Sequence, residues 1–450
     1  MNDYVIPSTV PCPDELRGAA AAWDAQGLSA RLAVVRAARC LIAARAEALA
    51  ATVARPLADT LVAEVLPLLE AARFLEREAA RLLAPRAPPG RRPLWLLGVR
   101  ATLRRERLGA VLILAPGNYP LFLPGVQALQ ALVAGNAVAW KPAPGGEAVA
   151  HALAAVLVEA GLPAGVLQVL GTDAGPMAVA AGFDHIVLTG SATTGAAVLA
   201  AAAHTLTPCT MELSGVDAVH VLPGADLSLV ARCLAYGLRL NGGATCIAPR
   251  RVFVPRRDAA ALEDRLAAIL PGVPDARPPP AVVARLEALT AGALAAGARR
   301  IGDAAPGRPT VLVDARPEMA LLQEDVFAPW LALVPVDDVA AGMRADTACP
   351  YALGASIFGP AAAARALAAR VRAGSVCIND VIVPTADPRL PFGGGGRSGF
   401  GRTRGAEGLL AMTVVKAVSE RWGWFRPHLA VPGPKDAARF GGMARWLHGR

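Results

Sequence analysis

A cysteine and a glutamate stand in settings that suit covalent catalysis. Cys246 ends the run NGGATC at 241–246, and Glu212 lies within the run TMELSG at 210–215. A thiol in a loop of small residues can form a covalent intermediate, and a carboxylate from a separate segment can activate the water that releases it. Glycines in such a loop let backbone N–H groups approach a reacting oxygen. The pair predicts a thiol enzyme, although a cysteine before Ile-Ala-Pro is also compatible with a small buried hydrophobic residue at a strand end.

Two further segments place polar groups beside buried strands. The run LILAPGNYP at 112–120 indicates an apolar strand that breaks into a turn, where the amide of Asn118 can donate to an oxyanion. The run LVAGNAVAWKP at 132–142 indicates a helix end, a Gly-Asn turn and a buried strand that finishes on Lys141. A ligand contact is typical of such a strand end. Because nearly all the basic charge is arginine, this lysine indicates that its compact ammonium is needed.

Short buried strands alternate with helices between Leu108 and Leu213. Strands are expected at 111–114, 138–140, 166–170 and 185–188, with a helix over 146–160 among them. This alternation predicts a parallel sheet with crossover helices, hence an open nucleotide-binding α/β fold.

The turn after the last of these strands begins with Gly190 and Ser191 and opens an alanine-rich helix. Its free N–H groups and positive dipole end suit a pyrophosphate. A Gly-Ser helix cap is also common for structural reasons alone, and the run is not the usual dinucleotide fingerprint.

A second α/β unit is expected from about Ser214 to Arg402, with strands at 219–222 and 251–254. Ligands should meet in the cleft between the two units. Helices are expected over 13–83, followed by a proline-rich break.

The segment 94–108 is expected to extend as a ribbon. The tail after Glu420 carries Trp422, Trp424, Phe425 and Trp446 among arginines, and a docking arm on the body or on a partner subunit is favoured over membrane attachment.

Composition narrows the class of protein. The chain has 450 residues, 54% of them hydrophobic, which supports two or more domains with substantial cores. The net charge of +9 comes from arginines spread among acidic residues, so no nucleic-acid partner is expected. Seven cysteines without metal-ligand spacing predict reduced thiols and no metal. Because the first residues lack a signal-peptide pattern and no apolar run suits a bilayer, a cytoplasmic protein without a membrane span is expected.

In this order the segments resemble the aldehyde dehydrogenase superfamily, over about 100–415. The motifs that carry the resemblance are PGNYP at 116–120, AGN at 134–136 through Lys141-Pro142, TGS at 189–191, ELSG at 212–215, the loop to Cys246, EDVFAP at 324–329 and PFGG at 391–394. LTP at 206–208, TCIAP at 245–249 and the glycines 393–396 before Ser398-Gly399 are most similar to the NAD(P)-dependent class 3 branch.

The resemblance implies an α/β fold of two open parallel-sheet domains with a small β element for oligomerisation. The NAD(P)-binding domain would comprise residues 1–93 and 109–213, and the catalytic domain residues 214–402. Residues 94–108 and 403–450 would form the oligomerisation ribbon and the C-terminal arm of a homodimer.

The resemblance also implies a reaction. Cys246 would attack an aldehyde to give a thiohemiacetal, with the oxyanion held by Asn118 and the N–H of Cys246. Hydride would pass to NAD or NADP, and Glu212 would activate the water that hydrolyses the thioester. The cofactor would be bound by Pro116, Lys141, Gly190, Ser191, Gly195, Leu213, Asp325 and Phe327.

Five positions depart from the family pattern. Pro144 replaces an acidic residue that would bond the adenosine ribose and repel a 2′-phosphate, which favours acceptance of NADP. Asp325 is one methylene shorter than the usual glutamate, so its ribose contact needs a small shift or a bridging water. Ser214, Val216 and Ala244 replace a glycine, a lysine and a glutamine, and indicate either an altered substrate pocket or lost activity.

Two alternatives therefore stay open beside hydrolytic oxidation. One is acyl transfer to coenzyme A, against which the presence of Glu212 counts. The other is a catalytically silent subunit. The aldehyde itself and the preferred cofactor are not predicted.

The remaining polar residues are given structural interpretations. His185 and His220 are expected as satisfied core histidines, and His204 is expected at a helix end. The pair Asp337-Asp338 is expected in a solvated loop, and Cys209 is expected to pack in its strand.

Overall fold

The computed structural model describes residues 10–305, 307–424 and 426–449, which form two compact units. The larger unit contains the chain up to Leu83 and Glu106–Val414, and the smaller unit contains Ala84–Arg105 and the chain from Val415 onward. The boundary expected at 403 is displaced because helix α15 (Gly405–Ala411) packs against α5 (Leu66–Leu83) and α6 (Phe122–Val133). Residues 84–93 belong with the smaller unit, where Arg86 forms a backbone bridge with Leu103.

A six-stranded sheet organises the first half of the larger unit, in the order β16-β6-β5-β2-β3-β4. Its strands are β2 (Ala110–Leu114), β3 (Ala137–Lys141), β4 (Leu167–Val169), β5 (His185–Gly190), β6 (Cys209–Leu213) and β16 (Gly399–Phe400). Strands β2 to β6 pair in parallel, and β16 pairs antiparallel with β6. The strand β2 is fully buried, as expected where helices cover both faces of a parallel sheet. The predicted parallel α/β fold is confirmed.

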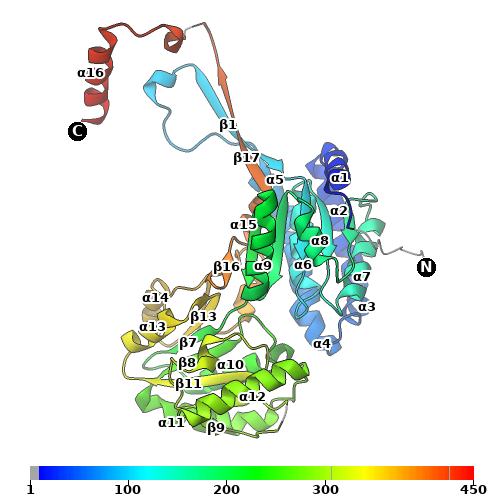
Figure 1. The fold of residues 1–450 in the computed structure, drawn as a ribbon, viewed down its shortest axis with the longest axis vertical. Coiled ribbons are helices and arrows are strands. Elements are labelled where there is room, and N and C mark those ends of the chain that lie inside the picture. Colours follow the sequence, from blue (N-terminus) through cyan, green and yellow to red (C-terminus); the bar gives the residue numbers. More distant parts are fainter. Residues whose placement is uncertain (1–9, 306, 425, 450) are drawn as a thin grey trace. The chain divides into compact units, whose positions relative to one another are not determined.

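The chain builds this sheet outward from β2 in two directions. It runs through α6 to β3 and through α7 (Glu147–Glu159) to β4, then through α8 (Gly175–Ala180) and α9 (Ala192–Ala202) to β5 and β6. Figure 1 labels the helices α6, α7, α8 and α9 that connect the strands of this sheet. Because crossovers between parallel strands are right-handed, α6 and α7 cover one face and α8 and α9 the other. The carboxyl ends of β2 and β5 therefore flank the point where ligands bind in open α/β sheets.

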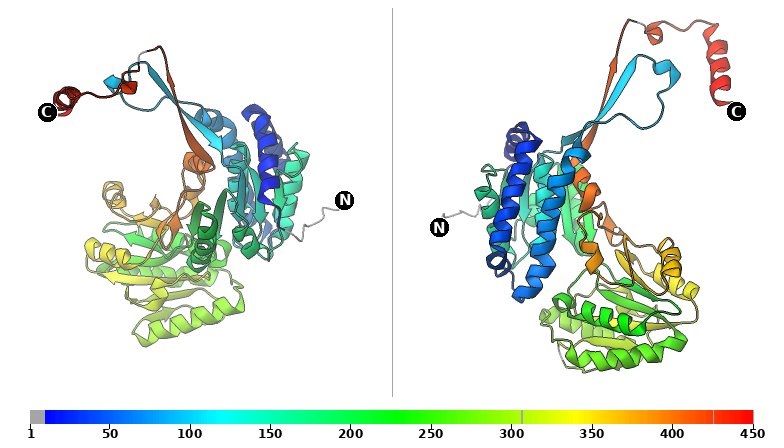
Figure 2. Two further views of the ribbon diagram at one scale, coloured as in Figure 1. Left: turned by 45° about the horizontal axis from the view of Figure 1, so that its top comes forward. Right: turned by 180° about the vertical axis from the view of Figure 1, so that it is seen from behind.

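The amino-terminal segment adds helices to the face that carries α6. Helices α1 (Pro13–Ala25) and α2 (Leu28–Ala44) precede α3 (Ala46–Ala50), α4 (Leu57–Thr60) and α5. Helices α2 and α5 pack against α6, and the blue helices cover this face when it is seen from behind (Figure 2). The expected helices over 13–83 are confirmed.

A seven-stranded sheet organises the second half, in the order β14-β13-β7-β8-β11-β10-β9. Its strands are β7 (Asp217–Val221), β8 (Pro249–Pro255), β9 (Arg299–Ile301), β10 (Thr310–Val313), β11 (Trp330–Val336), β13 (Gly354–Phe358) and β14 (Ser375–Ile378). The edge strand β9 is antiparallel, and the other neighbours pair in parallel. The helices of this half are α10 (Leu227–Arg239), α11 (Arg256–Ile269), α12 (Pro280–Ala295), α13 (Val339–Ala348) and α14 (Ala361–Ala368).

A buried amide links three segments of the first half. Asn136 is fully buried, and its Oδ1 accepts hydrogen bonds from the backbone N–H groups of Leu108 at 2.8 Å and Gly109 at 2.9 Å. Its Nδ2 donates to the carbonyls of Ala131 at 3.1 Å and Met412 at 2.9 Å. A side chain that satisfies four buried backbone groups fixes the entry of β2 against the end of α6.

The smaller unit contains the expected ribbon. Strand β1 (Val99–Arg107) pairs with β17 (Thr413–Arg421), and helix α16 (Asp436–His448) follows in the tail. Trp422 donates its backbone N–H to the carbonyl of Gly98 at 2.8 Å, while its ring stays exposed. Phe425 lies outside the described residues. The oligomerisation role of this unit stays a prediction.

None of the helices in the described part of the chain has the length and apolar composition needed to cross a membrane.

Candidate active site

The loop that carries Cys246 is held in an unusual backbone conformation. Asn241, Gly242 and Gly243 have φ angles of 51°, 58° and 75°, all in the left-handed region. A Cβ at position 243 would lie 2.5 Å from the Cα of Pro329, so only glycine fits there. These residues turn the chain sharply after α10 and bring Cys246 to the surface of a cavity.

Arg250 fixes this loop from inside the protein. Its buried guanidinium donates to the carbonyl of Gly243, to Ala328 O at 2.6 Å and to Trp330 O at 3.0 Å. It also stacks over the Trp330 ring at 5.3 Å. Burial lowers its pKa to about 10, and the guanidinium stays protonated at neutral pH. Arg250 is not among the residues predicted for the site, and its only signal in the sequence is an arginine pair inside an apolar strand.

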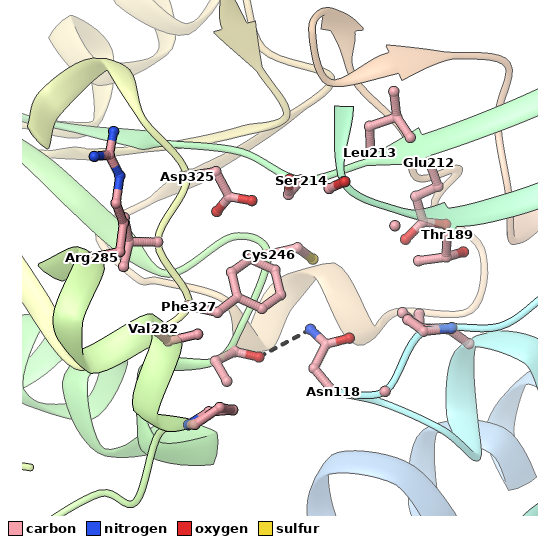
Figure 3. Close-up of a pocket in the computed structure, with 18 of the residues that line it drawn as sticks. Asn118, Thr189, Glu212, Leu213, Ser214, Cys246, Val282, Arg285, Asp325 and Phe327 are labelled. Atoms are coloured by element: carbon pink, nitrogen blue, oxygen red, sulfur yellow. Dashed lines mark hydrogen bonds between the residues drawn. The ribbon is translucent and has the colours of Figure 1, made fainter. Parts of the chain in front are cut away.

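The turn after β2 is hydrogen-bonded to the cysteine loop. Asn118 Nδ2 donates to Ala244 O at 3.0 Å, drawn as the dashed line in Figure 3. In return, Asn241 Nδ2 donates to Asn118 O at 2.9 Å, and Arg55 donates to the same carbonyl. The second N–H of the Asn118 amide is left for a ligand. The two halves of the larger unit thus meet at the predicted oxyanion donor.

Glu212 occupies a buried position in β6, with a side chain that is only partly hydrogen-bonded. Its Oε2 accepts a hydrogen bond from the Thr403 hydroxyl at 2.6 Å, whereas its buried Oε1 has no hydrogen-bond partner. Burial raises the pKa of Glu212, and the charge of Arg404 and the Thr403 bond partly offset this rise. One carboxylate oxygen is therefore positioned and the other is free to accept a proton.

These groups line one cavity of about 580 Å³. Figure 3 shows Asn118, Glu212 and Phe327 around Cys246. The lining comprises Pro116, Gly117, Asn118, Leu123, Thr189, Gly190, Ser191, Glu212, Leu213, Ser214, Ala244, Cys246, Pro279, Ala281, Val282, Arg285, Asp325, Val326 and Phe327. The cavity opens at the carboxyl ends of β2 and β5, where the fold predicts a ligand.

Two polar groups of this cavity lie close to each other and are incompletely hydrogen-bonded. Ser214 Oγ and Asp325 Oδ1 are buried and make no hydrogen bond. Burial raises the pKa of Asp325 to about 6, with the nearby Ser214 hydroxyl partly offsetting the rise. Buried polar atoms are normally satisfied, so both atoms indicate a ligand with hydroxyl or amide groups.

The turn after β5 is a genuine helix cap. Ser191 caps α9, and its Oγ accepts the N–H of Thr194 at 3.1 Å. Gly190 and Ser191 line the cavity, which leaves the first N–H groups of α9 near it.

A second, smaller cavity of about 110 Å³ also reaches Cys246. Apart from Thr245, Thr385 and Arg404, aromatic and aliphatic residues form most of its wall, including Tyr119, Tyr236 and Phe392. Cys246 and Leu123 line both cavities. A molecule in either cavity can therefore contact the thiol.

The surroundings of the thiol disfavour its ionised form. Burial raises the pKa of Cys246, and the charges of Glu212, Asp217 and Asp325 raise it further, while Arg404 opposes them. An ionised thiolate would have to form as a reactant binds.

Nine of the predicted site residues line the larger cavity: Cys246, Glu212, Asn118, Pro116, Gly190, Ser191, Leu213, Asp325 and Phe327. Lys141 and Gly195 do not. Lys141 is half-buried at the end of β3, and Gly195 packs so closely on Leu213 that a Cβ would lie 2.8 Å from Leu213 Cδ1. Their roles toward a cofactor stay predictions.

The other polar residues are explained by packing and caps. His185 bonds to Thr210 at 3.0 Å and burial lowers its pKa to about 4, and His220 bonds to Asp346 at 3.2 Å, so both are satisfied core histidines as predicted. Asp337 and Asp338 lie exposed in the loop before α13, as predicted, and the Asp338 carboxylate also caps this helix by accepting the N–H of Ala341 at 2.7 Å.

His204 ends the helical segment after α9, and Cys209 lies in β6, both as expected. All seven cysteines are free, and the described residues hold no group of three side chains suited to a metal ion.

Comparisons with known proteins give a consistent result. The model of the aldehyde dehydrogenase family matches residues 14–274 and 281–418. The 4,4'-diapolycopene aldehyde oxidase of Methylomonas sp is 32% identical over 75% of this chain, which spans 66% of that protein, just under two thirds. The benzaldehyde dehydrogenase [NAD(+)] of Pseudomonas putida is 34% identical over 71% of this chain and 68% of its own length.

A solved structure is also similar to this chain. The NADP-dependent glyceraldehyde-3-phosphate dehydrogenase from Bacillus halodurans C-125, complexed with NADP, has a TM-score of 0.84 and 28% sequence identity. The alignment covers 91% of this chain and 90% of that chain.

The Gly243→Ala substitution should destabilise the protein. The methyl group would strain a left-handed backbone and meet the backbone of Pro329, so we expect the free energy of unfolding to fall by about 1–3 kcal/mol in urea denaturation. Gly292 in α12 has open space around its Cα, and Gly292→Ala should stabilise by about 0.5–1 kcal/mol. Equal stability changes in the two variants would contradict the constraint at position 243.

Proposed function

The chain belongs to the aldehyde dehydrogenase family, and from this premise we propose that it oxidises an aldehyde to a carboxylic acid with NAD or NADP, through a covalent bond to Cys246. The observation that carries the proposal is the single cavity that gathers Cys246, Glu212 and Asn118 from separate segments. Oxidation of aldehydes is the activity named for the relatives of this chain.

The larger cavity fits a nicotinamide dinucleotide. The unpaired Asp325 Oδ1 and Ser214 Oγ suit ribose hydroxyls or a carboxamide, and the start of α9 suits a pyrophosphate. Phe327 offers a ring face beside Cys246. When bound, the nicotinamide supplies the hydride acceptor for the reaction. The benzaldehyde dehydrogenase relative is named for NAD(+), and the Bacillus halodurans structure holds NADP.

Cys246 begins the reaction by attacking the carbonyl carbon as its thiolate. Because burial disfavours this form, the thiol must lose its proton during binding, and the unpaired Oε1 of Glu212 is suited to accept it. The new C–S bond turns the carbonyl oxygen into an oxyanion. The second N–H of the Asn118 amide and the backbone N–H of Cys246 stabilise that charge, and loss of hydride then leaves a thioester on Cys246.

Glu212 then supports hydrolysis of the thioester. After its proton has passed to solvent, Oε1 accepts a proton from water, the resulting hydroxide attacks the acyl carbon, and the C–S bond breaks to regenerate the thiol. Thr403 holds Oε2 throughout, so the carboxylate keeps one orientation.

The preference between NAD and NADP depends on the surroundings of Lys141. Pro144 supplies no carboxylate there, which favours a 2′-phosphate. Burial lowers the pKa of Lys141, while the charges of Glu147 and Asp173 raise it, so two carboxylates would oppose a phosphate at the same lysine. We propose that both cofactors are accepted.

Acyl transfer to coenzyme A is the less favoured reaction, because Glu212 keeps a free oxygen in the cavity for activating water. A silent subunit is disfavoured by the same cavity, although Ser214, Val216 and Ala244 depart from the family pattern.

Reduced nicotinamide absorbance tests the activity. Purified protein with aliphatic and aromatic aldehydes, and with NAD or NADP supplied separately, should form reduced cofactor and free acid, whereas Cys246→Ala should form neither. An acyl-coenzyme A product in preference to acid would contradict hydrolysis. Undiminished reduction by Cys246→Ala would exclude the covalent route.

Thr403→Val should change the pH dependence of hydrolysis. The Thr403 hydroxyl stabilises ionised Glu212 and lowers its pKa, so its loss should raise that pKa. Only ionised Glu212 acts as a base, and the steady-state rate should therefore fall at a higher pH than in wild type as the solution is acidified.

Thr347→Val removes a hydroxyl that bonds only to the carbonyl of Met343 on the exposed side of α13, and it serves as the matched control. If the steady-state rate falls at the same acidic pH in Thr403→Val and in Thr347→Val, the role of Thr403 is overturned.

A further inference from the structure

Arg404 differs from the other buried arginines of the described chain. Arg31 lies 2.7 Å from Asp24, Arg251 lies 2.8 Å from Asp346, and Arg250 donates to three carbonyls. Arg404 is 5% exposed, yet among the described residues it forms no ion pair. A buried guanidinium is costly unless an anion or a set of hydrogen-bond acceptors compensates it, so an arginine with no ion pair and one carbonyl acceptor indicates a missing partner.

The guanidinium is held by its faces and by one nitrogen. It lies over the rings of Phe392 at 4.1 Å and Phe122 at 5.4 Å, and its Nη1 donates to Thr385 O at 2.8 Å. The opposite edge, formed by Nε and Nη2, includes a buried Nε–H that has no acceptor. This edge is the one with which arginine binds a carboxylate through two parallel hydrogen bonds.

The backbone at Arg404 has an unfavourable conformation. Its φ angle is 60°, and Ile382 on the wall of the same small cavity has a φ of 56°. Left-handed conformations are unfavourable for residues with a Cβ, and they cluster where function needs a side chain in one position.

Arg404 and Cys246 line the same cavity of about 110 Å³. This volume is much smaller than the roughly 580 Å³ of the larger cavity, so the space suits a short substituent. The rest of its wall is largely aromatic and aliphatic, which leaves the guanidinium as the one charged group that lines it. The charge of Arg404 interacts electrostatically with Glu212 and Cys246, but neither residue forms an ion pair with it.

We propose that the substrate is a short aldehyde with a carboxylate at its far end, and that Arg404 binds this carboxylate while the carbonyl carbon lies at Cys246. The inference rests on the proposed function and names its substrate class. A single cation with one open edge matches a planar monoanion, whereas a phosphate dianion would leave charge uncompensated in a buried cavity. Arg404 thereby acts as the residue that determines substrate specificity.

Binding to a protein that cannot react tests this assignment. We would titrate Cys246→Ala with 4-oxobutanoate and with butanal, which share a chain length, and measure both dissociation constants by calorimetry. We expect 4-oxobutanoate to bind at least about 10-fold more tightly. The preference should disappear in Cys246→Ala/Arg404→Met and should persist in part in Cys246→Ala/Arg404→Lys, which keeps the charge without the fork.

Arg370, an exposed arginine near the end of α14, provides the matched control. The double variant Cys246→Ala/Arg370→Met should keep the full preference. Equal dissociation constants in Cys246→Ala, or a preference that survives Arg404→Met with circular dichroism unchanged, would overturn the proposal. If Arg404→Met does not fold, full preference in Arg404→Lys would overturn it, because that variant lacks the bidentate edge.

Hydride transfer by the wild-type protein distinguishes a failure of the proposed oxidation from a failure of the proposed carboxylate site at Arg404. A binding preference without reduced cofactor from any aldehyde would refute the oxidation and leave the carboxylate site standing. Equal oxidation of both aldehydes together with equal binding would refute the carboxylate site and leave the oxidation standing.

Discussion

The hydrogen bonds between the turn after β2 and the cysteine loop are the constraint on which this site depends. Asn118 and Ala244 belong to different sheets, and covalent chemistry needs the amide of one beside the thiol that follows the other. Asn241 donates a second hydrogen bond, to Asn118 O. Arg250 holds the same loop in place by donating to the carbonyls of Ala328 and Trp330. Reacting groups must be placed within a fraction of an ångström of each other. The hydrogen bonds between the turn after β2 and the cysteine loop therefore matter more for the geometry of the site than either sheet alone.

Burial gives each ionisable group of the site its chemical character. It raises the pKa values of Cys246, Glu212 and Asp325, so burial disfavours the charged form of each of these groups. Two buried cations oppose this effect, and their hydrogen bonds distinguish them. Arg250 uses its N–H groups on backbone carbonyls and supports the loop, whereas Arg404 lines the smaller cavity and has a buried Nε–H without an acceptor.

Much of this arrangement could be predicted from local sequence. The strands at 111–114 and 185–188 are short aliphatic runs between turn residues, and their parallel pairing follows from the helices between them. Asn118, Glu212 and Cys246 were found because motifs at strand ends and in small-residue loops are readable without a structure. Their chemical roles remain predictions, which the geometry supports.

Other features depend on contacts between residues far apart in the chain. Thr403 and Arg404 reach the site only because β16 pairs antiparallel with β6, and no local pattern reveals that pairing. The same fact explains the misplaced boundary, since a segment assigned to the tail packs into the larger unit. Lys141 does not line the larger cavity, so its role toward the cofactor stays a prediction.

The covalent bond at Cys246 is the central claim, and mass spectrometry of trapped enzyme tests it most directly. Glu212→Gln should form the thioester more slowly than wild type, because the thiol loses its proton acceptor, and should slow its hydrolysis far more, by roughly 10²–10⁴-fold, because it lacks the general base. Mixed with aldehyde and oxidised cofactor and then digested, it should yield the Cys246 peptide heavier by the acyl group, and Glu212→Gln/Cys246→Ala should yield no adduct. Reduced cofactor formed without any acylated Cys246 peptide would contradict this account.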